Sequence, residues 1–144
     1  MSSIDAPKAP PLRDPLAGVI LGIGQDLVHV PRMAALVGKW GQRFLDRVFT
    51  AGEQAYCRAR QDPAPHLAAR FAAKEAFYKA IARGRELPLY FRDAEVVHEP
   101  RAGLSLRLSE KAQRIAAEAG VGAVHLTLTH DGEYAAAVVV LERG

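Results

Sequence analysis

The sequence predicts a single α+β domain, with helices in the first half of the chain and mostly antiparallel strands in the second. Its 144 residues suit one domain, and 49% hydrophobic with 24% charged residues excludes disorder for most of the chain. An Ala-rich stretch without Gly or Pro predicts a long helix from His66 to about Arg83, with Gly84 as its stop. An Asp131-Gly132 step between two strand-like runs predicts a β-hairpin.

The first 17 residues contain four prolines, which interrupt regular helices and strand pairing. We expect a flexible or extended leader over residues 1–17 and the working domain over residues 18–144. The apolar run over residues 18–24 predicts a buried strand that places Asp26 at its carboxyl end.

Helix signals follow this strand. Pro31 suits the first turn of a helix, and Thr50 and Glu53 have the spacing of a capping box at the start of a second one. The Asp-Pro-Ala-Pro segment over residues 62–65 is typical of a turn. In the second half, we expect strands over 94–98, 104–108, 123–130 and 134–141 and a helix over 110–119.

The net charge of +3 is unevenly distributed. Residues 27–92 hold twelve Lys/Arg and five Asp/Glu, which favours a polyanionic ligand or an acidic partner protein, although a solvated basic surface gives the same pattern. The single cysteine, Cys57, excludes an internal disulfide, and no Cys/His cluster has zinc-ligand spacing. No apolar run approaches the roughly 20 residues of a membrane span, and no signal peptide is evident. We therefore expect a cytoplasmic protein that binds no membrane.

Glu75 is the first candidate for chemistry. On the predicted long helix it lies at the edge of an apolar stripe, one turn before Lys79; the stripe comprises Leu67, Phe71, Tyr78 and Ile81. The alternative is an ordinary Glu75–Lys79 pair on a wet face. Arg70 and Lys74 lie elsewhere on the helix, where we expect solvent-exposed charges.

Asp26 is the second candidate, since the end of a strand is open to a ligand. The alternative is an Asp that caps the helix near Pro31. Gly22 and Gly24 indicate a phosphate loop only weakly, because the third glycine of a dinucleotide motif is missing. If Asp26 and Glu75 converge, they form a pair of hard oxygen ligands suited to Mg²⁺.

His130 is the third candidate. It ends a row of residues on one strand face, after Val124, Leu126 and Leu128, and a structural role is the alternative. Cys57 has no neighbouring activator in the sequence, which argues against a nucleophilic cysteine.

Five stretches in order resemble holo-acyl-carrier-protein synthase, the short bacterial 4′-phosphopantetheinyl transferase family. The similarity covers residues 18–142, and the Arg-Phe-Ala-Ala-Lys-Glu-Ala-Phe segment of the third stretch is highly specific. The stretches are Gly22-Ile-Gly-Gln-Asp-Leu-Val-His-Val-Pro-Arg32, Arg47-Val-Phe-Thr-Ala-Gly-Glu53, Leu67-Ala-Ala-Arg-Phe-Ala-Ala-Lys-Glu-Ala-Phe-Tyr-Lys79, Asp93-Ala-Glu-Val-Val97 and Leu126-Thr-Leu-Thr-His130.

The resemblance implies a single-half phosphopantetheinyl transferase fold and a reaction that supports fatty acid biosynthesis. A serine hydroxyl of apo-acyl carrier protein attacks the β-phosphate of coenzyme A, and adenosine 3′,5′-bisphosphate leaves. By position, Asp26 and Glu75 match the family's Mg²⁺ ligands, and Glu75 is a possible base. Lys79 matches a residue that stabilises phosphate charge. The other implied coenzyme A contacts are Arg70, Lys74 and His130.

The resemblance also implies an acidic carrier protein docked at Arg32 and a homotrimer with active sites between subunits; it implies no nucleic acid. Thr127 and Thr129 replace the family's usual serines, and the loop over residues 99–103 departs from the family pattern. Three alternatives remain: the same transfer onto a polyketide or peptide synthetase carrier, a non-catalytic coenzyme A-binding module, and a basic adaptor for acidic proteins.

Overall fold

The computed structural model describes residues 5–12, 18–101 and 103–144. A three-stranded antiparallel sheet of order β1-β5-β4 is built from β1 (Ile20–His29), β5 (Tyr134–Arg143) and β4 (Val121–Asp131). A second, two-stranded antiparallel sheet pairs β2 (Ala94–Glu99) with β3 (Gly103–Leu108). The predicted α+β class and the β4–β5 hairpin at Asp131-Gly132 are confirmed.

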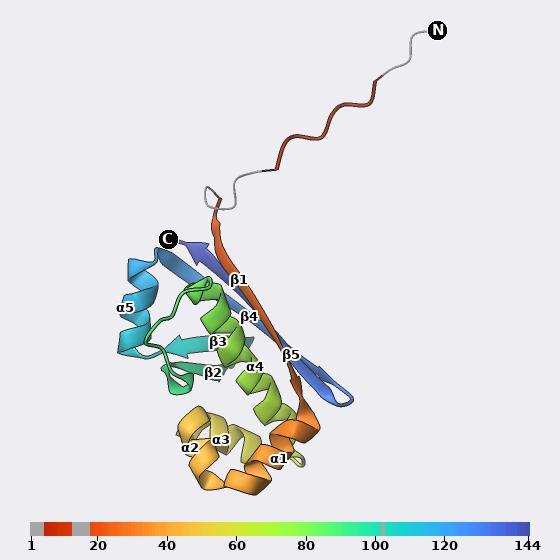
Figure 1. The fold of residues 1–144 in the computed structure, drawn as a ribbon, viewed down its shortest axis with the longest axis vertical. Helices are drawn as coiled ribbons and strands as arrows, with labels where there is room; N and C mark the ends of the chain where they lie inside the picture. Colours follow the sequence, from red (N-terminus) through yellow and green to blue (C-terminus); the bar gives the residue numbers. More distant parts are fainter. Residues whose placement is uncertain (1–4, 13–17, 102) are drawn as a thin grey trace.

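The helices form two groups around a long central one (Figure 1). The helices are α1 (Val30–Trp40), α2 (Gln42–Val48), α3 (Ala51–Arg58), α4 (Pro63–Ala82) and α5 (Glu110–Glu118), with a 3-10 turn η1 (Phe91–Asp93) before β2. The long central helix is α4. Helices α1, α2 and α3 precede it in the sequence and lie beyond one of its ends, whereas α5 stands beside the β2–β3 sheet.

Helix α4 is the centre of the core because small side chains cover most of its circumference. Seven of its alanines are at most 3% exposed, namely Ala68, Ala69, Ala72, Ala73, Ala76, Ala80 and Ala82. With so little bulk on α4, the strands approach its backbone closely. A Cβ on Gly24 would lie 1.9 Å from the Ala76 carbonyl oxygen, and one on Gly22 would lie 2.2 Å from that of Ala80. The two glycines are therefore required for strand–helix packing, and they form no phosphate loop.

Several boundaries differ from the prediction. Strand β1 continues to His29 because it pairs with β5 along its whole length, so Asp26 lies inside the strand and the prediction that it ends one is wrong. The predicted turn over residues 62–65 is also wrong. Asp62 caps α4 by accepting a hydrogen bond from the Ala64 amide, and Pro63 occupies the first turn, where a missing N–H is harmless. Helix α2 was not predicted.

The capping box of Thr50 and Glu53 is confirmed at the start of α3. Residues 5–12 are exposed and contain no helix or strand, as their prolines predict. The rest of the predicted leader, residues 1–4 and 13–17, lies outside the described residues, and the domain boundary at residue 18 stays a prediction. In the described part of the chain, no helix is both long and apolar enough to cross a membrane.

Candidate active site

Asp26 owes its orientation to the strand period. Side chains two residues apart share one face of a strand, so Asp26 shares the face on which Gly22 and Gly24 contact α4. β1 and α4 run in opposite directions, because Gly22 lies against Ala80 and Gly24 lies against Ala76. Asp26 therefore faces the middle of α4. It does not cap α1, whose N-cap residue is His29, so the capping alternative is wrong.

Lys79 links α4 to this part of β1. Its Nζ lies 2.9 Å from Asp26 Oδ1 and donates a second hydrogen bond of 3.1 Å to the Gln25 carbonyl oxygen. Helical side chains lean toward the N-terminus of their helix, which brings Lys79 back toward Asp26. The salt bridge of Lys79 thus spans two elements, instead of the local Glu75–Lys79 pair that was the alternative.

Glu75 is half-buried, one turn before Lys79 on α4. Burial raises the pKa of its carboxyl group, the negative charge of Asp26 raises that pKa further, and the Lys79 ammonium opposes both. Glu75 is therefore close enough to interact electrostatically with both Asp26 and Lys79. Two carboxylates and one ammonium from β1 and α4 form this group, which we call the carboxylate site.

Lys74 was expected to be solvent-exposed, and that prediction is wrong. Its ammonium is buried and lies 2.6 Å from Glu53 Oε1, 3.0 Å from the Phe91 carbonyl oxygen and 2.7 Å from that of Ala94. These three acceptors match the three N–H donors of a lysine. Glu53, buried with it, also accepts hydrogen bonds from the Thr50 and Val96 amides. The pair therefore holds α3, α4, η1 and β2 together.

Arg70 is also buried, contrary to the prediction, and it belongs to an aromatic and cationic cluster. The guanidinium carbons of Arg70 and Arg60 each lie 4.0 Å from the centre of the Tyr56 ring. Arg70 donates to the His66 carbonyl oxygen, but within the described residues its buried Nε has no hydrogen-bond partner. An unpaired buried guanidinium nitrogen is costly without a ligand, which makes an anion a suitable occupant.

His130 lies in the same cluster. It ends the row of residues on one face of β4 that begins with Val124, as predicted. Its ring centre is 5.4 Å from that of His66, and the Tyr56 ring stacks on His98 at 5.6 Å. Burial lowers the pKa of His66, with the nearby His130 and both arginines acting in the same direction. These side chains line a cavity of about 180 Å³, which we call the cationic pocket; its lining includes Tyr56, His66, Arg70, His98, Thr129 and His130.

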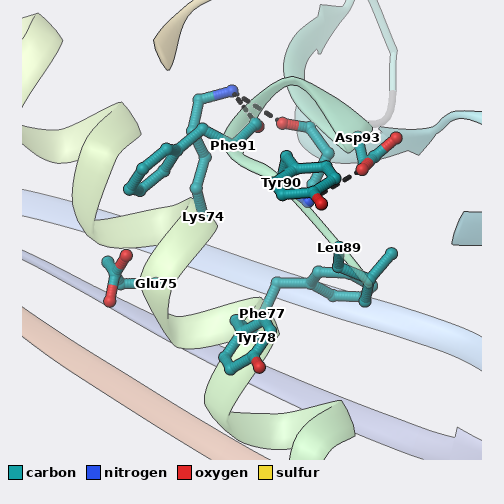
Figure 2. A pocket seen from close by; sticks show the side chains of 9 residues that line it. Lys74, Glu75, Phe77, Tyr78, Leu89, Tyr90, Phe91 and Asp93 are labelled. Atoms are coloured by element: carbon teal, nitrogen blue, oxygen red, sulfur yellow. Dashed lines mark hydrogen bonds between the residues drawn. The ribbon is translucent and has the colours of Figure 1, made fainter. Parts of the chain in front are cut away.

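A second cavity, of about 260 Å³, is lined in part by Glu75. In Figure 2 the Glu75 side chain stands at its edge, apart from Tyr78, Leu89 and Tyr90. Its two other charged lining groups are already paired within the protein. Lys74 is saturated as described, and Asp93 accepts hydrogen bonds from the Tyr90 amide and Ser109 and an ion pair from Lys111. We call this cavity the apolar pocket.

Sequence reasoning missed Tyr56, His66 and His98. The four-residue spacing of His66 and Arg70 was a usable signal, since both lie on one face of α4. The contact of His98 with Tyr56 depends on how β2 packs against α3, which no local pattern encodes. Arg32 is exposed on α1, and burial raises the pKa of the Cys57 thiol to about 11, which makes it a poor nucleophile.

Comparisons with known proteins decide the family. The sequence profile of the 4′-phosphopantetheinyl transferase superfamily matches residues 22–139. The chain belongs to this superfamily. The predicted resemblance is thereby confirmed.

The curated relatives and solved structures agree with this assignment. Holo-[acyl-carrier-protein] synthase of Halothermothrix orenii is 41% identical over 88% of this chain and 100% of its own length, and that of Cronobacter sakazakii is 42% identical over 85% and 98%. The fold resembles the crystal structure of holo-[acyl-carrier-protein] synthase from Neisseria meningitidis, with a TM-score of 0.78 and 32% identity over 86% of this chain and 99% of that one. A similar structure from Bacillus anthracis, with a TM-score of 0.70 and 30% identity over 88% and 100%, is a complex with CoA (3′,5′-ADP).

Proposed function

We propose that this transferase moves the 4′-phosphopantetheine group of coenzyme A onto a serine of apo-acyl carrier protein, in support of fatty acid biosynthesis. The observation that carries the proposal is the carboxylate site. In a chain of this superfamily, Asp26, Glu75 and Lys79 come together from β1 and α4.

The transfer is a displacement at phosphorus. The serine oxygen of the carrier forms a bond to the β-phosphorus of coenzyme A, and the bond from that phosphorus to the bridging oxygen of the pyrophosphate breaks. Adenosine 3′,5′-bisphosphate leaves with the bridging oxygen, and the serine proton passes to a base. Such reactions depend on positioning and charge neutralisation more than on covalent help from the protein.

The residues of the carboxylate site fit Mg²⁺. Magnesium usually takes one or two protein carboxylates and fills its other positions with water and substrate phosphates. Asp26 and Glu75, whose carboxylates interact electrostatically, would supply the two protein ligands of such a site. When bound, Mg²⁺ supplies positive charge against the pyrophosphate.

The chain's own groups would do the rest. Lys79 is half-exposed on α4, so its ammonium can turn to the phosphates and stabilise charge there. Glu75 is the group proposed to accept the serine proton, since its carboxylate lies in the same site as Asp26 and Lys79.

The remaining groups of coenzyme A have complementary surroundings. The cationic pocket, with the unpaired Nε of Arg70 and the imidazole of His130, suits an anionic phosphate. The apolar pocket beside Glu75 suits the pantetheine arm, whose first carbons beyond the phosphate are a dimethyl-substituted chain. Lys74 is left out of this assignment, because its three donors are already used inside the protein.

Arg32 is proposed as a contact for the acidic carrier protein. It is exposed on α1, in the part of the chain that carries the excess of basic residues. Opposite charges on two partners mainly speed their association, and salt weakens this effect. A reducing cytoplasm is consistent with the free, buried Cys57.

We further propose a homotrimer in which the open face of the β1-β5-β4 sheet is covered by neighbouring subunits. This face carries Ile23 and Leu27, which are 66% and 65% exposed. Exposed apolar side chains that lie together on a sheet mark an interface more often than a free surface. Light scattering after size exclusion tests this: the wild type should have three times the monomer mass, and a monomeric wild type would contradict the proposal.

The reaction itself is tested by intact-protein mass spectrometry. An apo-acyl carrier protein is incubated with the protein, coenzyme A and Mg²⁺, and a parallel sample contains EDTA. The carrier should gain the mass of one phosphopantetheine only without EDTA. If fatty-acid, polyketide and peptide synthetase carriers all gain no mass while coenzyme A still binds, the proposed transfer is wrong.

A further inference from the structure

The partners of Lys79 suggest a role before any substrate arrives. Its ammonium contacts two oxygen atoms, Asp26 Oδ1 at 2.9 Å and the Gln25 carbonyl oxygen at 3.1 Å. A carboxylate and a carbonyl oxygen are the ligand types that also bind hard divalent cations. The Lys79 ammonium therefore occupies one of the positions open to a cation ligated by Asp26.

The two carboxylates of the carboxylate site favour a cation beside them. Asp26 and Glu75 carry like charges, and both are partly removed from water, with 17% of the Asp26 side chain exposed. Like charges in such surroundings repel more strongly than in bulk water.

We propose that Lys79 is an exchangeable internal counter-ion: it neutralises Asp26 and Glu75 in the metal-free protein and leaves Asp26 when a divalent cation binds. The released ammonium is then available for the phosphates of coenzyme A. This inference rests on the proposed function only in placing the metal at Asp26 and Glu75.

The surroundings of Lys79 permit this exchange. Its side chain is 52% exposed, and its two acceptors leave one N–H donor for solvent or a ligand. An ion pair of this exposure is weak, so a divalent cation can replace it at small cost. Lys74, on the same helix, has three protein acceptors and no exposure, which excludes it from such a role.

The exchange couples two ligands. When a cation takes Asp26, Lys79 becomes free for an anion, and when an anion attracts Lys79, Asp26 becomes free for a cation. Binding of the metal and of coenzyme A should therefore be mutually favourable beyond their direct contact, and the coupling must be the same in both directions.

Mn²⁺ binding to the full chain, measured by electron paramagnetic resonance without coenzyme A, tests the competition. Lys79→Met removes the charge but keeps most of the side-chain volume, and Lys79→Arg keeps the charge. Lys111→Met is a matched control, because Lys111 forms an ion pair of 3.0 Å with Asp93 and is 36% exposed. We expect Lys79→Met to bind Mn²⁺ about three- to tenfold more tightly than the wild type, as loss of a weak competing ion pair and of a nearby positive charge implies.

Lys79→Arg should bind Mn²⁺ no more tightly than the wild type, and Lys111→Met should match it. The inference is overturned if Lys79→Met binds Mn²⁺ with unchanged or weaker affinity, or if Lys111→Met gains as much. It is also overturned if neither the wild type nor Lys79→Met binds Mn²⁺, since an Asp26–Glu75 pair freed of its lysine must attract a divalent cation.

Thermal unfolding gives a second readout. In EDTA, Lys79→Met should melt below the wild type, because its two carboxylates lack a counter-ion; Mn²⁺ should raise its melting temperature more than that of the wild type. Equal Mn²⁺-induced shifts would contradict the inference. These outcomes are separable from the proposed function, because a wild type that transfers no phosphopantetheine can still show the competition at Asp26.

Discussion

Two lysines on α4, five positions apart, form ion pairs of opposite character. Lys74 and Glu53 are 2.6 Å apart with side chains that are at most 1% exposed, whereas Lys79 and Asp26 are 2.9 Å apart and partly in solvent. The first pair has every lysine donor satisfied by the fold, and the second leaves one donor free. Distance alone does not separate a structural ion pair from a functional one; burial and saturation do.

The largest effect is expected from breaking the buried pair. Lys74→Met leaves the Glu53 carboxylate buried without its counter-ion, which should lower the free energy of unfolding by about 3–5 kcal/mol. Lys79→Met should lower it by no more than about 1 kcal/mol, since exposed pairs contribute little. Urea unfolding, with both variants in the same buffer with EDTA, measures the difference.

A double variant sharpens this test. Glu53→Gln together with Lys74→Met removes both charges and keeps one side-chain oxygen, which can accept from only one of the two amides, Thr50 and Val96, that separate oxygens of Glu53 bind. It should recover part of the stability lost in Lys74→Met, because no unpaired charge remains. If Lys74→Met and Lys79→Met are equally stable, the contrast between the two pairs is wrong.

The two carboxylates of the carboxylate site should matter more for turnover than for folding. Asp26→Asn and Glu75→Gln each remove a charge from the group proposed to hold Mg²⁺, and we expect phosphopantetheine transfer to fall roughly 10²- to 10³-fold. Circular dichroism should show an intact fold in both. The mass-spectrometric transfer assay at several Mg²⁺ concentrations measures the loss, and a variant with wild-type turnover would remove its residue from the mechanism.

The sequence predicted the convergence of Asp26, Glu75 and Lys79 better than it predicted the surroundings of Lys74. Asp26, Glu75 and Lys79 were singled out from position and resemblance, and the structure brings them together even though Asp26 lies inside β1 rather than at its end. The prediction that Lys74 is exposed was wrong. Its partner Glu53 lies on another helix, and the capping box already accounted for the presence of a glutamate at that position. When a residue has two structural roles, a local sequence pattern reveals only the local one.

The fold shows the same division between local and distant determinants. The hairpin at Asp131-Gly132 and the capping box at Thr50 are set by a few neighbouring residues, and both were predicted. The length of β1 depends on pairing with β5, more than a hundred residues away, and so was underestimated. The cationic pocket depends on the packing of α3, α4, β2 and β4 together, which no pattern in one segment contains.

Glu75 should show opposite effects on stability and activity. Its pKa is raised in the folded protein, so the ionised form destabilises the fold at any pH above that raised value. As pH falls through the folded pKa, Glu75 takes up a proton, and the destabilisation disappears once pH is below the ordinary value for glutamate. Glu75→Gln should therefore be more stable than the metal-free wild type at pH 8, by roughly 1 kcal/mol or less, and the gap should close toward pH 4.

Thermal unfolding of both proteins in EDTA across this pH range measures the gap. A gap that widens as pH falls would reverse the sign and rule out a raised pKa for Glu75.

Arg32 should give the smallest effect, since it belongs to neither ion pair and lies on the exposed face of α1. Arg32→Ala should raise the KM for the carrier protein about two- to fivefold at low salt, the size expected for one exposed charge pair. The affinity for coenzyme A should stay unchanged. Lys39→Ala, at the end of the same helix, shows whether the effect follows position or merely net charge.

Because salt screens exposed charges over about 10 Å at 0.1 M, the difference between Arg32→Ala and the wild type should shrink as salt is added. A KM difference that persists in 0.5 M salt would mean that Arg32 acts through packing, and an unchanged KM at low salt would place the carrier elsewhere.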